Sequence, residues 1–203
     1  MFEVLILSLL LTFSYKFVEI GIKSSKILQN YSIYFWAVII MIVVPFYKDN
    51  YIFSLPANIM RVMPIFLVIV FANYLLSRFS GYNPVGKFNI INFIIVYPII
   101  EELIFRGLIL PSLNQNLNSG VFLEVMYMPV TVPVIISALL FAISHLQYYG
   151  LSLISIRYMV FAFFGGIVFG AITDLTESIL LSCILHIEFN ALAVYFANKS
   201  RLR

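Results

Sequence analysis

The sequence predicts an all-α integral membrane protein: a polytopic transmembrane bundle of about seven helices around an intramembrane polar cavity. Three observations support this prediction. Of the 203 residues, 63% are hydrophobic and only 10% are charged, and the mean hydropathy is +1.04, whereas soluble domains average about 45–50% apolar and about 25% charged residues. The apolar residues fall into separate runs of about 20, the length that crosses a bilayer. One of these runs nevertheless contains three ionisable residues, which at membrane depth indicate function by default.

The first three predicted helices are marked by hydrophobicity alone. The run at 3–21 lacks the basic start and the small-residue cleavage site of a signal peptide, so we expect a retained crossing. Lys23 and Lys26 separate it from the run at 31–47. Lys48 and Asp49 end that run before the third one, at 60–77. Charged side chains are costly in the hydrocarbon core and therefore indicate connections.

The remaining four predicted helices carry the polar residues of interest. The run at 88–112 contains the ionisable group, and further runs at 130–148, 152–173 and 178–197 follow Pro129, Gly150 and Glu177. Seven crossings leave no room for a separate soluble domain. We therefore expect a single integral membrane domain over residues 1–203, located in the cell membrane with the lipid bilayer as its surroundings.

The composition argues against several classes of function. The net charge of +3 comes from scattered Lys and Arg, with no basic run interleaved with aromatic residues, so nucleic acid is not an expected partner. The single cysteine, Cys183, lies in an apolar run, and an intrachain disulfide cannot form. Its simplest role is that of a small core residue.

The ionisable group is Glu101-Glu102-Leu103-Ile104-Phe105-Arg106. On a helix, Glu102 and Arg106 are four residues apart and lie on one face, which favours an ion pair. Glu101 points about 100° away and has no partner nearby in the sequence. One carboxylate can thus be held ionised by the arginine while the other serves as a general base. The alternative is a buried ion network that only fastens helices together.

Both histidines of the chain, His145 and His186, lie in predicted transmembrane helices. Either one alone would more often be a hydrogen-bonded core residue than a catalyst. Their contexts differ from that default, because Phe141 precedes His145 by one helical turn and Asn190 follows His186 by one turn on the same face. An imidazole and a carboxamide on one face can both donate hydrogen bonds to a developing oxyanion.

These three patterns occur on separate hydrophobic helices in a fixed order: Glu-Glu-x-x-x-Arg, Phe-x-x-x-His and His-x-x-x-Asn. The ordered set resembles the CPBP intramembrane proteases, the group of the CAAX prenyl endopeptidases and the bacteriocin-processing or Abi proteins. The resemblance covers about residues 88–197, the expected catalytic core. It implies a membrane-embedded helical fold and hydrolysis of a peptide bond by a glutamate-activated water, with a membrane-associated, lipidated or leader peptide as the substrate.

The resemblance also implies roles for individual residues. Glu101 would activate the water with the assistance of His145, and Glu102 with Arg106 would balance the charge of the site. His186 and Asn190 would stabilise the tetrahedral oxyanion. Glu101, His145 and His186 could instead bind zinc, although the chain lacks the His-Glu-x-x-His pattern of many zinc proteases. We favour the reading without a cofactor.

Two other classes of function compete with a protease. A non-enzymatic bacteriocin-immunity or scaffold protein could keep the polar cluster for folding or for partner binding, but it would not need this particular set of residues. A transporter or proton channel could use intramembrane Glu and His as a relay. Such a protein is expected to show paired halves with broken helices, and the sequence has no internal repeat. The sequence does not indicate an oligomeric state.

Overall fold

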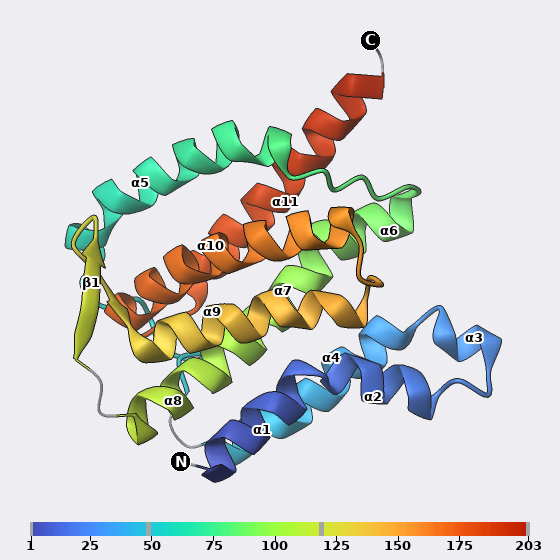
Figure 1. Ribbon diagram of the computed structural model, residues 1–203, viewed down its shortest axis with the longest axis horizontal. Helices are drawn as coiled ribbons and strands as arrows, with labels where there is room; N and C mark the ends of the chain where they lie inside the picture. The colour runs from blue at the N-terminus through green and yellow to red at the C-terminus, as the bar shows by residue number, and fades with distance from the viewer. Residues whose placement is uncertain (1, 48–49, 118–119, 202–203) are drawn as a thin grey trace.

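A computed structural model describes residues 2–47, 50–117 and 120–201. The chain is mostly helical, and the helices pack around a central helical segment over 87–116 (Figure 1). Three helices are long and apolar enough to cross a membrane: Ile59–Phe79, Leu153–Thr176 and Leu180–Lys199. A bent pair near the N-terminus would make a fourth span if it crosses as one unit. The predicted helical class agrees with this architecture, and the number of about seven crossings stays a prediction.

The N-terminal region forms one side of the molecule. Helices α1 (Phe2–Thr12) and α2 (Ser14–Gly21) meet at a bend of 53°, so the continuous helix predicted at 3–21 is wrong. The short α3 (Lys26–Gln29) leads into α4 (Ser32–Val43), which ends in the 3-10 turn η1 (Val44–Phe46). The buried Trp36 donates a hydrogen bond from Nε1 to Ser14 Oγ at 2.8 Å, which fastens α4 to α2.

Helix α5 (Ile59–Leu76), continued by the 3-10 turn η2 (Ser77–Phe79), lies at the opposite edge of the molecule (Figure 1). Its outward apolar side chains, such as Leu67 and Phe71, are exposed, as expected of a surface that meets lipid. Its one buried amide, Asn73, donates to the Leu185 carbonyl and to Glu188 Oε2, both at 3.0 Å. Glu188 therefore faces α5.

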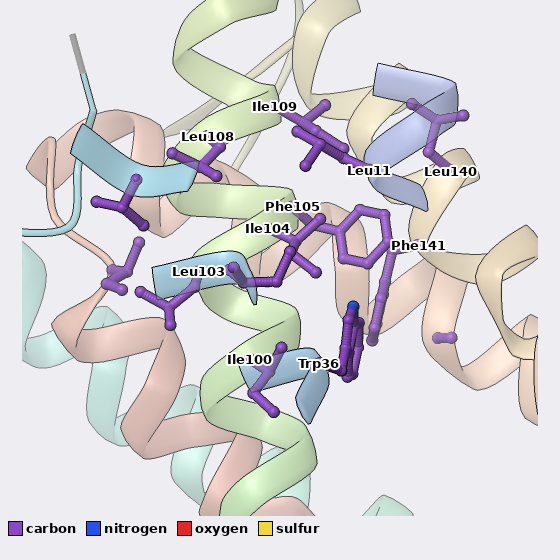
Figure 2. Close-up of a cluster of buried hydrophobic side chains, with 14 of the residues drawn as sticks. Leu11, Trp36, Ile100, Leu103, Ile104, Phe105, Leu108, Ile109, Leu140 and Phe141 are labelled. Carbon is purple, nitrogen blue, oxygen red and sulfur yellow. The ribbon is translucent and has the colours of Figure 1, made fainter. Parts of the chain in front are cut away.

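The central segment is one helix of changing register. It consists of α6 (Lys87–Ile91), the π-helical η3 (Asn92–Val96), α7 (Tyr97–Glu102), the π-helical η4 (Leu103–Ile109) and α8 (Leu110–Asn116). The run predicted at 88–112 is thus confirmed and extends further. Figure 2 shows apolar side chains of this segment, including Ile104 and Phe105, packed with Trp36 of α4 and Phe141 of α9. This core surrounds the buried charges and keeps them from lipid.

A small β-hairpin follows the central segment and was not predicted. Strands β1 (Val121–Val125) and β2 (Met128–Thr131) pair antiparallel. The turn residues Met126 and Tyr127 have φ of 53° and 64°, a conformation that Asn and Gly usually supply in such turns. Because neither residue type is present, the sequence lacks the usual hairpin signal. The prediction of an all-α protein is incomplete in this respect.

The last three helices pack against the central segment. Helix α9 (Val132–Ser144) is capped by Thr131 Oγ1, which accepts from the Val134 amide, and it ends in the 3-10 turn η5 (His145–Gln147). It starts later than the predicted residue 130 because β2 extends to Thr131. Helices α10 (Leu153–Thr176) and α11 (Leu180–Arg201) agree with the runs predicted at 152–173 and 178–197. Helix α10 packs against α9 and α11, and α11 packs against α5 and α7.

Candidate active site

The three ionisable residues of the central segment are all buried. Glu101 is 5% exposed, and Glu102 and Arg106 are 0% exposed. Glu101 and Glu102 end α7, between the two π-helical stretches, and Arg106 lies within the second stretch, η4. A π-helical turn adds a residue to the turn and changes the direction of the side chains that follow, and such turns are frequent at functional sites. The unusual register thus coincides with the charged group.

Glu102 is the centre of a buried charge network. Its Oε1 accepts hydrogen bonds from Arg106 Nη1 and from His186 Nδ1, both at 2.9 Å. The first contact is the ion pair that the spacing of four residues predicts, and the second joins α7 to α11. Because an ionised carboxylate only accepts hydrogen bonds, Nδ1 of His186 carries the hydrogen. The neutral form of His186 then has its free lone pair on Nε2.

The guanidinium of Arg106 occupies a space left open by a glycine. Its Cζ lies 4.3 Å from the ring centroid of Phe141, which gives a cation-π contact. On the other side, a Cβ added at Gly166 would lie 3.3 Å from Arg106 Nη2 and 3.0 Å from the Cβ of Ala138. Gly166 on α10 therefore makes room for the arginine. The sequence alone does not indicate which residue needs this space.

Glu101 has no ion pair of comparable length. Its Oε2 lies 3.8 Å from Nε2 of His186, beyond the range of a hydrogen bond. The imidazole of His186 thus lies between the two glutamates and is hydrogen-bonded to Glu102 alone. The carboxyl group of Glu101 is left to face the cavity described below.

His145 begins η5, directly after α9, and its ring orientation is set locally. Nδ1 lies 3.0 Å from the carbonyl of Phe141, which can only accept, so Nδ1 donates and Nε2 keeps a lone pair. The ring makes an edge contact with Phe141 at a centroid distance of 5.2 Å. The Phe-x-x-x-His pattern therefore positions the imidazole through both the ring and the backbone of its phenylalanine.

Gln147 fastens η5 to the bend between α1 and α2. Its Nε2 donates to the Thr12 carbonyl at 2.8 Å, and its Oε1 accepts from the Lys16 amide at 3.2 Å. The two backbone groups flank Phe13, where the N-terminal helix is broken. The amide side chain thus bonds to backbone groups at the break and holds η5 in place. Sequence reasoning missed this residue, because its partners are more than 130 positions away.

Asn190 donates a hydrogen bond to the central segment, and the π-helical register of that segment explains why the accepting carbonyl is free. Its Nδ2 donates to the Phe93 carbonyl at 2.7 Å. In the π-helical register the amide of Tyr97 bonds to the carbonyl of Asn92, so the Phe93 carbonyl would need the amide of residue 98. That residue is Pro98, which has no N–H. The carboxamide replaces the missing donor, and one of its two amide hydrogens remains for another partner.

Two cavities meet at these residues. A polar cavity of about 270 Å³ is bordered by Glu101, His145, His186 and Asn190 together with several tyrosines. One of these, Tyr82, is a buried loop residue, and burial raises the pKa of its hydroxyl well above the usual range, so it stays a neutral donor. A second, largely apolar cavity of about 460 Å³ lies between α5, α10, α11 and the hairpin. Both cavities include His145, His186 and Asn190.

The candidate zinc ligands do not fit a metal in this arrangement. Within residues 2–47, 50–117 and 120–201, no three His, Cys, Asp or Glu side chains are grouped so that they could hold a metal ion. His145 and His186 each use Nδ1 in a hydrogen bond, and Nε2 of His186 lies 3.8 Å from Glu101 Oε2. We therefore derive no step through a metal.

The family comparison agrees with the order of the motifs. The model of the family described as type II CAAX prenyl endopeptidase, Rce1-like, matches residues 83–192, more than half of the chain. The match includes all six candidate residues, and it confirms the resemblance to the CAAX-protease group that the three motifs predict. No curated protein and no solved structure matches the chain.

Proposed function

The chain belongs to the Rce1-like family of type II CAAX prenyl endopeptidases, and from this premise we propose that it is an intramembrane endopeptidase with a glutamate-activated water. The observation that carries the proposal is the unequal environment of two adjacent glutamates. Glu102 is bound by Arg106 and His186, whereas Glu101 faces a polar cavity. A general base must be free to take up a proton, and Glu101 meets that requirement.

In the proposed reaction, the residues that border the polar cavity act one after another. Glu101 accepts a proton from a water molecule that also donates to Nε2 of His145, and the resulting hydroxide attacks the peptide carbonyl. The carbonyl oxygen becomes an oxyanion. Glu101 then returns the proton to the leaving nitrogen as the C–N bond breaks, so the products are a carboxylic acid and an amine, which become a carboxylate and an ammonium ion when the acid proton passes to the amine. Glu102 and Arg106 stay a neutral pair and keep the net charge of the site low.

His186 and Asn190 are the proposed donors to the oxyanion. The remaining amide hydrogen of Asn190 is suited to this task, because its first one is held by the Phe93 carbonyl and fixes the orientation of the carboxamide. His186 can donate from Nε2 when that nitrogen is protonated, while Glu102 keeps its Nδ1 in place. Both residues border the polar cavity and the apolar one, where a peptide would reach the base.

The apolar cavity supports a proposal for the class of substrate. A site that joins a polar cavity to a larger apolar one fits a substrate with a hydrophobic portion next to the cleaved bond, such as a lipidated tail or a hydrophobic leader peptide. We further propose that the whole chain is one integral membrane domain of the cell membrane with about seven crossings, and that the reaction needs no cofactor. A scaffold or immunity role is not favoured, because it assigns no purpose to a Glu101 carboxyl group that borders the polar cavity.

The test combines one substitution, one control and a chelator. The purified protein in detergent is incubated with quenched fluorescent peptides, either prenylated at a C-terminal cysteine or leader-like and hydrophobic. Glu101→Gln is nearly isosteric and removes the base, so we expect a folded protein without activity. Glu3→Gln is the matched control, because Glu3 is exposed on α1, borders neither cavity and should keep wild-type activity when replaced.

Each outcome has a distinct meaning. Cleavage that survives the chelator and disappears in Glu101→Gln supports the glutamate-activated water. Full activity of Glu101→Gln would refute the mechanism. Activity lost with the chelator and restored by stoichiometric zinc would refute the proposed independence from a metal, and no cleavage of any peptide by the wild type would contradict the protease proposal for this chain.

A further inference from the structure

Tyr148 places an unbonded hydroxyl in the wall of the polar cavity. Among the described residues, four buried side-chain atoms have no hydrogen-bond partner: Glu102 Oε2, Arg106 Nε, Arg106 Nη2 and the Tyr148 hydroxyl. Of these three residues, Tyr148 alone lines the polar cavity. A buried hydroxyl without a partner costs about 1–3 kcal/mol, so this group is expected to meet a ligand.

The ring of Tyr148 is held rigidly. It makes edge contacts with Tyr15 and Tyr97 at centroid distances of 5.0 and 5.3 Å, and it also touches the rings of Trp36 and His145. Its backbone amide donates to the His145 carbonyl at 3.2 Å, which continues the turn that Gln147 anchors. A donor that is fixed before the reaction needs no reorganisation when charge develops.

The hydroxyl also complements the other donors of the cavity. His186 uses its Nδ1 hydrogen for Glu102, and Asn190 uses one amide hydrogen for a backbone carbonyl. The Tyr148 hydroxyl makes no hydrogen bond of normal geometry with the described residues, and it lies near enough to the Glu101 carboxyl group to interact with it. A phenol is protonated at neutral pH and can donate. The hydroxyl is therefore placed next to the Glu101 carboxylate, which would activate the attacking water.

We propose that Tyr148 is a catalytic residue whose hydroxyl donates a hydrogen bond to the peptide carbonyl oxygen as that oxygen becomes negatively charged. The inference rests on the proposed peptidase function and adds a donor to it. The phenol keeps its proton throughout, and the bonds formed and broken remain those of hydrolysis. The hydrogen bond strengthens in the transition state, so it should act on kcat more than on KM.

The test is Tyr148→Phe, with Tyr127→Phe as the control. Because the Tyr148 hydroxyl is buried and makes no hydrogen bond of normal geometry in the described part of the chain, its removal should not lower the melting temperature and should raise it if the burial cost is relieved. We expect kcat for the best-cleaved peptide to fall by about 100-fold, the scale of losing one oxyanion donor, with KM within about threefold of wild type. Tyr127 lies exposed on the hairpin turn, and its variant should retain wild-type kinetics.

The outcomes separate this inference from the function on which it rests. An active wild type with wild-type kcat in Tyr148→Phe would overturn the role of Tyr148 alone. Loss of binding of a non-cleavable peptide analogue by Tyr148→Phe would also overturn it, because the residue would then serve packing or substrate binding. An inactive wild type would overturn the peptidase proposal and this inference together.

Discussion

Replacing Gly166 by alanine should test the space that the buried arginine needs. The added Cβ would lie 3.0 Å from the Cβ of Ala138, 3.1 Å from its Cα and 3.3 Å from Arg106 Nη2. These distances are shorter than ordinary carbon contacts of about 3.5–4.0 Å, and the backbone of α9 cannot yield as easily as a side chain. Overpacking of this kind costs about 1–3 kcal/mol. If the guanidinium is also displaced from Glu102, the cost approaches the roughly 3–5 kcal/mol of a broken buried ion pair.

The neighbouring glycine provides the matched control. A Cβ at Gly165 would have no neighbour within 4 Å, so Gly165→Ala should be as stable as the wild type or slightly more stable, since alanine is the better helix former. Stability is measured as the free energy of unfolding in mixed detergent micelles and as the melting temperature. The double variant Gly166→Ala with Ala138→Gly removes the shortest contact and should recover part of the loss. Equal stability of the Gly166→Ala and Gly165→Ala proteins would refute the reasoning.

Three further predictions concern the residues around the cavity. Glu102→Gln leaves Arg106 buried without a charged partner and should lower the free energy of unfolding by about 3–5 kcal/mol. Glu101→Gln should change that free energy little. A lower melting temperature for Glu101→Gln than for Glu102→Gln would contradict the assigned roles. Gln147→Leu removes two hydrogen bonds to the N-terminal bend and should cost about 1–3 kcal/mol of stability, seen as a lower melting temperature; an unchanged value would show that the bend does not depend on them. Asn190→Ala leaves the Phe93 carbonyl without its donor and should reduce the free energy of unfolding by about 1–3 kcal/mol. It should also reduce kcat by about 10²–10³-fold, because an oxyanion donor is lost. Unchanged stability would contradict the structural role of Asn190, and unchanged kcat would contradict its role as an oxyanion donor.

The family and the candidate residues were accessible from local patterns. Six polar residues in three motifs were selected because each pattern contains a pair of residues one helical turn apart and Glu101 directly precedes one of these pairs, and the family match includes all six. The Glu102–Arg106 pair followed from the same rule and is present at 2.9 Å. Local spacing is sufficient here because side chains three or four residues apart on a helix meet in any fold.

Other features required knowledge of the whole chain. The break at Phe13 and the hairpin over 121–131 were missed, because the first has no proline or glycine and the second has no typical turn residue. The partners of Gln147, and the carbonyl that accepts from Asn190, are distant in sequence. Such contacts depend on how helices pack, and a pattern within one helix contains no information about them.

The sequence by itself therefore determined the helical membrane class, the family and the identity of the charged residues, since these depend on hydrophobicity and on spacing within single helices. The spacing of four residues also assigned Arg106 to Glu102 and left Glu101 without a partner nearby in the sequence. Only the tertiary structure decided what the other helices bring to the two carboxyl groups, because those contacts join residues far apart in the sequence. Helix α11 brings His186 to Glu102, and η5 brings His145 and Tyr148 to the cavity that Glu101 faces.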